Sequence, residues 1–273
     1  MAINKIAWLT DAHLNFLEPE ARNIFYQKVS GADMDAVLIT GDIAEATSIC
    51  KLLTEFSENV DKDIYFVLGN HDYYLGNVVK VRREVQQLCN KNKKLHWLGK
   101  PEIIKLSHQT ILLGHDGWAD ARYGDFDRSN INLNDSRYIA ELFQASALGK
   151  AALKYEMQKL ADTDAVALEK TLQEAIAKNN PQKVIVATHV PPFKECCRYK
   201  GKPSDENWQP YFSSKATGDV ISAAAKKHPA INFLVLCGHT HTKHAIKPFN
   251  NLEVRVGGAE YYQPEVQEII EIK

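Results

Sequence analysis

The chain has 273 residues, of which 45% are hydrophobic and 25% are charged, as is usual for a globular protein with a large core. Lys and Arg (33) nearly balance Asp and Glu (34), which argues against a large non-specific nucleic-acid surface. No apolar run approaches the roughly 20 residues that cross a bilayer, and the first residues lack an apolar signal region. The five cysteines lack the spacing of zinc motifs, so we expect a cytoplasmic protein with reduced thiols and no membrane partner.

Apolar strands alternate with helices in the first third of the chain. Strands are predicted over residues 3–9, 36–39 and 64–68, and helices over residues 18–29, 46–59 and 78–90. This alternation is typical of a sheet whose neighbouring strands are parallel and covered on both faces. Because ligands of such sheets bind beyond the carboxyl ends of the strands, the residues that follow each strand are candidates for function.

Metal-ligand residue types follow each of these three strands. The third strand ends in Gly69, which permits a sharp turn, and three polar residues come next. Burying such side chains together is costly unless a cation or a phosphate group pairs with them. The residues concerned are Asp11 and His13 after the first strand, Asp42 after the second, and Asn70, His71 and Asp72 after the third.

The middle of the chain departs from this alternation. Short apolar runs at residues 96–98, 102–106 and 109–114 predict a meander of strands, and a polar loop follows at 121–135. Residues 136–178 are predicted to be mostly helical, with a break between two helices at 162–164. We expect these helices to pack against the sheets rather than to cover the site.

The last third of the chain returns to strands that end in metal-ligand types. A strand over 183–187 ends in Thr188-His189, and a strand over 233–237 ends in Gly238-His239-Thr240-His241. A polar loop at 193–212 and a helix over 213–228 separate them, and short strands at 243–247, 252–256 and 265–272 close the chain. Because repeats and low-complexity linkers are absent, we predict a single domain over residues 1–273, with two sheets inside and helices outside.

The collected strand ends suit a pair of metal ions. Mixed carboxylate and imidazole ligands favour manganese, iron, zinc or nickel over magnesium or calcium. Two divalent ions that share one carboxylate would polarise a phosphoryl group and supply a bridging hydroxide that attacks phosphorus. A histidine is the natural general acid for the leaving oxygen, because its pKa lies near neutrality.

The ordered motifs Asp-x-His, Gly-Asp, Gly-Asn-His-Asp, Thr-His and Gly-His-Thr-His resemble those of the calcineurin-like metallophosphoesterase superfamily. They run from Asp11 to His241, and although any one motif is weak, the ordered set is specific. The resemblance implies an α/β fold, a four-layer α/β/β/α sandwich of two mixed sheets flanked by helices. One departure is Thr188, which stands where many relatives have Gly.

The resemblance also implies a role for each matched residue. Asp42 would bridge the two metals, and His71 would act as the catalytic acid, with Asp72 helping to orient it. The first metal would be held by Asp11, His13, Asp42 and His241, and the second by Asp42, Asn70, His189 and His239.

These observations predict a dinuclear-metal hydrolase of phosphate esters, a small-molecule phosphodiesterase or phosphatase. A nuclease of the same superfamily is less favoured, because the charge is balanced and no basic arm is present. A metal-binding scaffold without turnover is the alternative of a different class. The core motifs are shared by enzymes for monoesters and diesters, so both remain open, as does the oligomeric state.

Substrate recognition is expected to reside in the loops. His115 follows a strand and could reach the substrate, although a packed, hydrogen-bonded histidine fits the same position. Arg122 and Tyr123 lie in the polar loop, where a solvated surface is the alternative.

The loop at 193–212 mixes basic and aromatic residues. Arg198, Lys200 and Lys202 accompany Tyr199 and Trp208, a combination able to hold a phosphate group and a flat ring. An exposed loop without a ligand would look the same, but loops of about 20 residues are often functional.

Overall fold

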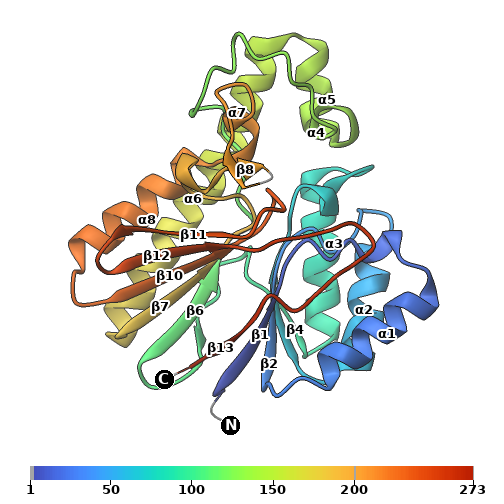
Figure 1. Cartoon of the computed structure of the whole chain (residues 1–273), viewed down its shortest axis with the longest axis vertical. Coiled ribbons are helices and arrows are strands. Elements are labelled where there is room, and N and C mark those ends of the chain that lie inside the picture. Colours follow the sequence, from blue (N-terminus) through green and yellow to red (C-terminus); the bar gives the residue numbers. More distant parts are fainter. Residues whose placement is uncertain (1–2, 200, 273) are drawn as a thin grey trace.

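Two mixed β-sheets face each other at the centre of the computed structural model, which describes residues 3–199 and 201–272 (Figure 1). Their strands are β1 (Lys5–Leu9), β2 (Ala36–Thr40), β3 (Asp63–Val67), β4 (Leu95–Trp97), β5 (Ile104–Lys105), β6 (Thr110–Gly114), β7 (Lys183–Ala187), β10 (Asn232–Cys237), β11 (His244–Phe249), β12 (Leu252–Val256) and β13 (Glu268–Glu271). A separate hairpin consists of β8 (Arg198–Tyr199) and β9 (Lys202–Pro203).

The strand order is β13-β1-β2-β3-β4 in the first sheet and β11-β12-β10-β7-β6-β5 in the second. Strands β1 to β4 are parallel to one another, as are β12, β10, β7 and β6. The edge strands β13, β11 and β5 pair antiparallel with their neighbours. The central strands are buried along nearly their whole length, as the continuous apolar runs predict for sheets covered on both faces.

Helices cover the outer face of each sheet. In Figure 1 one group lies beside the first sheet and another beside the second, while two short helices stand above the strand ends. The first group is α1 (Pro19–Ser30), α2 (Ile49–Val60) and α3 (Val78–Lys91); the second is α6 (Lys150–Asn179) and α8 (Lys215–Lys227); the short pair is α4 (Asp135–Tyr138) and α5 (Ala140–Ala147). The remaining helical turns are η1 (Leu14–Phe16), η2 (His71–Tyr73), η3 (Lys194–Cys196) and α7 (Gln209–Phe212).

Three apolar clusters fill the spaces between these layers. The cluster between the sheets joins Trp8 and Leu38 of the first sheet to Leu236 of the second. Trp8 is 1% exposed, and its indole nitrogen donates a hydrogen bond to the Thr40 hydroxyl at 3.0 Å. Removing such a buried ring costs about 3–5 kcal/mol. The predicted four-layer α/β/β/α sandwich of two mixed sheets is therefore confirmed.

Helix α6 runs unbroken through the point where a break was predicted. Neither polar side chain competes for the backbone N–H groups of the helix, because the Thr163 hydroxyl donates to the carbonyl of Lys159 and Asp164 accepts hydrogen bonds from Arg82. The chain breaks earlier, at Gly149, whose φ of 108° is accessible to glycine. The polar triplet therefore does not end a helix.

Two further expectations need correction. The three strands predicted as a meander over 96–114 do not form one. Strand β4 pairs in parallel with β3 in the first sheet, whereas β5 and β6 pair with each other in the second sheet. The predicted helical stretch also divides in two: the second half of α6 packs on the second sheet through Leu168 and Leu172, whereas α4 and α5 lie above the strand ends (Figure 1). That the chain forms one domain over 1–273 stays a prediction.

The carboxyl ends of β1, β2, β3, β7 and β10 meet at one edge of the sandwich, the upper edge of the sheets in Figure 1. Backbone hydrogen bonds join the loops there: Asp11 N–H donates to the Gly41 carbonyl at 3.0 Å, and Gly238 N–H donates to the His189 carbonyl at 3.0 Å. Within the described residues, no helix combines the length and apolar character needed to span a membrane.

Candidate metal centre

Five of the predicted metal ligands have a left-handed backbone. Non-glycine residues rarely adopt a positive φ, which costs about 1–3 kcal/mol each and persists where the surrounding structure enforces it. Strain concentrated in this way is typical of functional sites. The residues are Asp11 (φ 49°), His13 (41°), Asp42 (52°), His239 (71°) and His241 (54°).

Two glycines let the strand-end loops close over the carboxylates. A Cβ atom at Gly69 would collide with Oδ1 of Asp42, and a Cβ atom at Gly238 would collide with Oδ2 of Asp11. Only a hydrogen fits at either position, so these glycines are needed for close approach rather than for a turn alone.

Asp11, His13, Asp42 and His241 form a first group whose ligand atoms all lie within 4.8 Å of one another. Nε2 of His13 is 3.4 Å from Nε2 of His241, which is 3.3 Å from Oδ1 of Asp11. Oδ2 of Asp42 is 3.9 Å from Nε2 of His13. The side chains come from the ends of β1, β2 and β10, so three strands of two different sheets supply one group.

Burial and hydrogen bonding set the charges in this first group. Burial opposes ionisation of Asp11, but the hydrogen bond with His241 lowers the pKa of the carboxyl to about 2. The Thr10 hydroxyl donates to Oδ2 of Asp11 at 2.6 Å, and the His239 N–H donates to its Oδ1 at 3.0 Å. Burial lowers the pKa of His13 to about 4. The group therefore offers an ionised carboxylate and a neutral imidazole to a cation.

Asn70, His189 and His239 form a second group on the other side of Asp42. Oδ1 of Asn70 is 3.0 Å from Nε2 of His189 and 2.9 Å from Nδ1 of His239. Nε2 of His189 is also 3.3 Å from Oδ1 of Asp42. All four side chains are buried.

The outer nitrogens of the two histidines fix their tautomers. Nδ1 of His189 lies 2.8 Å from the Thr40 carbonyl and Nε2 of His239 lies 2.9 Å from the Tyr211 carbonyl, so each must donate a proton. In the neutral histidines, the inner nitrogens then turn lone pairs toward Oδ1 of Asn70, whose amide nitrogen is engaged elsewhere. Lone pairs converging in a buried space favour a divalent cation, and outer partners of this kind are typical of metal-ligating histidines.

Asp42 faces both groups. Its Oδ1 lies 3.3 Å from Nε2 of His189 and its Oδ2 lies 3.9 Å from Nε2 of His13, an arrangement that suits a shared ligand. Burial opposes its ionisation, but His189 and His71 hold the pKa of the carboxyl well below its usual value. Burial likewise opposes protonation of His189, yet Asp42 raises the pKa of that imidazole to about 10, so Nε2 carries a proton that a bound cation would displace. The residues present therefore fit two cations sharing one carboxylate.

His71 lies at the edge of this centre, with its side chain 16% exposed. Its ring stacks on Tyr74 at a centroid distance of 4.2 Å and meets His13 edge-on at 4.6 Å. Nε2 lies 4.0 Å from Oδ2 of Asp42, whereas Nδ1 is buried without a hydrogen-bond partner. Tyr74 therefore orients the ring by stacking.

The Asp72 carboxylate has no hydrogen bond with the His71 ring within the described residues, and its expected part in orienting His71 stays a prediction. Its Oδ1 accepts hydrogen bonds from the N–H groups of Ile43 and Ala44, and its Oδ2 accepts one from Gly69. Burial, aided by Asp42, raises the pKa of Asp72 to about 8. Asp72 thus ties the loop after β2 to the loop after β3.

The loop residues predicted to bind substrate lie in different surroundings. His115 is buried, with Nδ1 3.0 Å from Oδ2 of Asp164, and Arg122 pairs with Asp120 at 3.1 Å and Asp162 at 2.8 Å. Across residues 3–199 and 201–272, neither these two nor Tyr123 has a hydrogen bond or ion pair with the metal-binding groups. Arg198 lines a cavity that also borders Thr240, the residue between His239 and His241.

His115, Asp116 and Asp164 also lie close enough together to suit a metal ion. The guanidinium of Arg82 occupies this position instead, 2.7 Å from Oδ2 of Asp164 and 3.0 Å from Oδ2 of Asp116. A buried cation already neutralises the cluster, so we assign it a structural role.

The sequence reasoning missed Tyr261, Phe16 and Asp135. The Tyr261 ring lies 4.8 Å from His13 and 5.1 Å from His241, and Phe16 stacks on His13 at 5.6 Å. Tyr261 follows β12, another parallel strand of the second sheet, so the strand-end rule applied to β12 could have found it. Asp135 had no comparable signal in the sequence.

Comparison with known proteins gives the family and the fold. The family model described as "Calcineurin-like phosphoesterase" matches residues 4–243. Among solved structures, phosphopantetheinyl hydrolase from Mycobacterium tuberculosis is 12% identical with a TM-score of 0.66, covering 99% of this chain and 96% of its own. A dimetal phosphatase from Danio rerio is 10% identical with a TM-score of 0.58, covering 94% and 88%. A search of curated proteins found no significant match.

Proposed function

Because the chain belongs to the calcineurin-like phosphoesterase family, we propose that it is a metal-dependent hydrolase of small-molecule phosphate esters. The observation that carries this proposal is the convergence of Asp11, His13, Asp42 and His241 from three strand ends, within 4.8 Å of one another. The near balance of 33 basic and 34 acidic residues supports a small substrate over a nucleic acid.

The two groups on either side of Asp42 would hold two divalent ions of manganese, iron, zinc or nickel type. When bound, such ions polarise the phosphoryl group and lower the pKa of a water molecule between them. The ligands would be Asp11, His13, Asp42 and His241 for the first ion, and Asp42, Asn70, His189 and His239 for the second.

The protein's own contribution is positioning and proton transfer. His71 would donate the proton from Nε2 to the leaving oxygen, because this atom faces the centre and its ring is held by Tyr74. The backbone N–H of His71 donates to Oδ1 of Asp42 at 2.9 Å, which fixes the acid relative to the bridging carboxylate.

The test is hydrolysis of bis-p-nitrophenyl phosphate and p-nitrophenyl phosphate by manganese-loaded protein, with His71→Ala as the control. Preference for the diester, lost in the variant, would support a phosphodiesterase; preference for the monoester would support a phosphatase. If two metals are bound and neither ester, nor a wider panel of phosphate esters, is hydrolysed, the proposal is wrong and a scaffold role takes its place.

A further inference from the structure

A cavity of about 510 Å³ opens beside the metal centre, within the size range of small-molecule sites. It lies between the β8–β9 hairpin and α7, in the loop that the sequence singled out for its basic and aromatic residues. The residues of interest in its wall are Arg198, Tyr199, Lys202, Trp208, Phe212 and Thr240.

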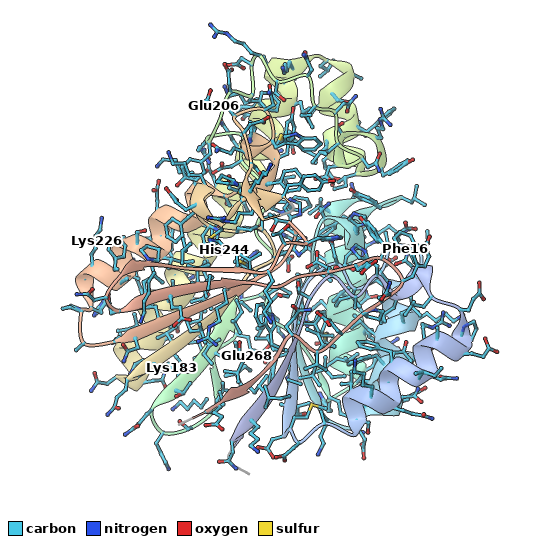
Figure 2. All side chains as sticks on the ribbon, in the orientation of Figure 1. Phe16, Lys183, Glu206, Lys226, His244 and Glu268 are labelled. Atoms are coloured by element: carbon cyan, nitrogen blue, oxygen red, sulfur yellow. The ribbon has the colours of Figure 1, made fainter. Side chains whose placement is uncertain are left out.

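The cavity shares a wall with the metal centre. Thr240 stands in sequence between the predicted ligands His239 and His241, and the Phe212 ring lies 5.0 Å from the His239 ring. Figure 2 shows the segment from β8 to Glu206 rising above the ends of the sheets, with His244 lower, at the start of β11. Phe212 and Thr240 therefore place the cavity next to His239.

One side of the cavity is a platform for a flat ring. Trp208 is 40% exposed and lies 5.7 Å from the Phe212 ring, and the neighbouring Tyr199 is 66% exposed. The three other tryptophans of the chain are at most 5% exposed. Leaving a tryptophan exposed beside Phe212 costs apolar burial, and stacking with a ligand ring would recover it.

The cavity wall also carries positive charge, from Arg198 and Lys202. In the described part of the chain, no carboxylate forms an ion pair with Arg198 or Lys202. Nη1 of Arg198 donates to the Gly201 carbonyl at 2.9 Å, while its Nε is buried without a hydrogen-bond partner. Lys200 lies outside the described residues.

The carboxylate that lines the cavity does not neutralise this charge. Oδ1 of Asp205 accepts hydrogen bonds from the backbone N–H groups of Asn207 at 2.9 Å and Trp208 at 3.3 Å. Asp205 therefore shapes the turn that presents Trp208, and it leaves the guanidinium of Arg198 available to an anion.

We propose that this cavity binds the part of the substrate remote from the reacting phosphate. A flat heteroaromatic ring stacks on Trp208 with its edge toward the tilted Phe212 ring, and a second negative charge pairs with Arg198 and Lys202. The substrate is accordingly a nucleotide-type ester that carries a second phosphate or carboxylate. This inference rests on the proposed function, because it names the substrate class of the same metal centre.

The test measures binding rather than turnover, in manganese-loaded full-length protein carrying His71→Ala. The probe is adenosine 3′,5′-bisphosphate, with adenosine and inorganic phosphate as its separate parts. We expect the bisphosphate to quench tryptophan fluorescence, because Trp208 is the exposed tryptophan, and calorimetry gives the affinity of variants that lack it.

Trp208→Ala should weaken binding of the bisphosphate and of adenosine about tenfold, and leave inorganic phosphate unaffected. Arg198→Ala should weaken binding of the bisphosphate about tenfold and leave binding of adenosine unaffected. The matched controls are Tyr155→Ala and Lys170→Ala, which remove an aromatic and a cationic side chain at exposed positions on α6. Neither should change the affinity for the bisphosphate or for adenosine.

Absence of saturable bisphosphate binding, or affinities that Trp208→Ala and Arg198→Ala leave unchanged, would overturn the inference. The proposed function fails separately. If the bisphosphate binds and the two variants weaken that binding, but the protein hydrolyses no phosphate ester, the proposed hydrolase function is wrong. If the protein hydrolyses the nitrophenyl esters but does not bind the bisphosphate in this way, only the assignment of the cavity is wrong.

Discussion

Asp135 holds the side-chain amide of Asn70. Oδ1 of Asp135 accepts a hydrogen bond from Nδ2 of Asn70 at 2.9 Å and another from the Tyr74 hydroxyl at 2.6 Å. With its nitrogen fixed in this way, the amide turns Oδ1 toward His189 and His239. Asp135 is the first residue of α4, so the short helices above the strand ends contribute directly to the candidate metal centre.

Asp135→Ala should weaken the second metal about 10- to 100-fold, because the Asn70 amide loses the acceptor that fixes its orientation. The measurement is manganese affinity by calorimetry, and excess metal should restore activity. Asp127→Ala, in the same loop region with a side chain 72% exposed, is the control. Equal affinities in the two variants would remove Asp135 from the site.

Asp42→Asn should weaken both metals, by more than about 100-fold, since both would lose the shared carboxylate and its charge. Metal content after dialysis, measured by mass spectrometry, gives the stoichiometry. The comparison is Asp33→Asn, whose side chain is 88% exposed. Two ions retained at full occupancy in Asp42→Asn would contradict the bridging assignment.

His71→Ala should keep the fold and the metal content but lower kcat about 10²- to 10⁴-fold, the range expected for a general acid. Nitrophenyl esters differ from alkyl esters in needing less protonation of the leaving oxygen. The loss should therefore be larger for an alkyl phosphate ester. A uniform loss across leaving groups would instead indicate a role in positioning.

Removal of metal should lower the melting temperature. Buried Asp11 and Asp42 are then left without the cations that offset their charge. Metal at 100 times its Kd stabilises the folded state by about 2.7 kcal/mol, which corresponds to about 5 °C for a chain of this length. Differential scanning fluorimetry with and without chelator measures the shift, and identical melting curves would argue against a metal bound in the native state.

Asp164→Asn should lower the free energy of unfolding by about 3 kcal/mol at pH 7, because Arg82 loses one of its two buried carboxylates. Burial opposes ionisation of Asp164, but His115 and Arg82 lower its pKa below the ordinary 3.8. Because the pKa of Asp164 is lower in the folded than in the unfolded protein, its ionised carboxylate stabilises the fold above the unfolded pKa, and this stabilisation is lost as the pH falls toward the folded pKa.

The difference between wild type and Asp164→Asn should accordingly be present at about pH 5 and shrink as the pH falls below about 4. Urea denaturation across this range provides the measurement. A difference that grows as the pH falls would contradict the assigned ionisation of Asp164.

Strand ends were what the sequence predicted best. Apolar runs such as 36–40 and 183–187 are buried on both faces, so their residues alone determine strands, and the parallel arrangement places Asp11, Asp42 and His189 at one edge. The predicted break at 162–164 is wrong because Asp164 is buried against Arg82, which lies 82 residues away along the chain.

The sequence by itself determined the candidate ligand types, their order and the strand ends that carry them, because hydrophobic periodicity and residue chemistry are local properties. Only the tertiary structure decided which oxygen of Asp42 faces which group, that Asp72 supports the backbone, and that Asp135 reaches Asn70. These relationships join residues far apart in sequence through side-chain rotamers and loop closure. They follow from packing the two sheets together, and no local pattern encodes them.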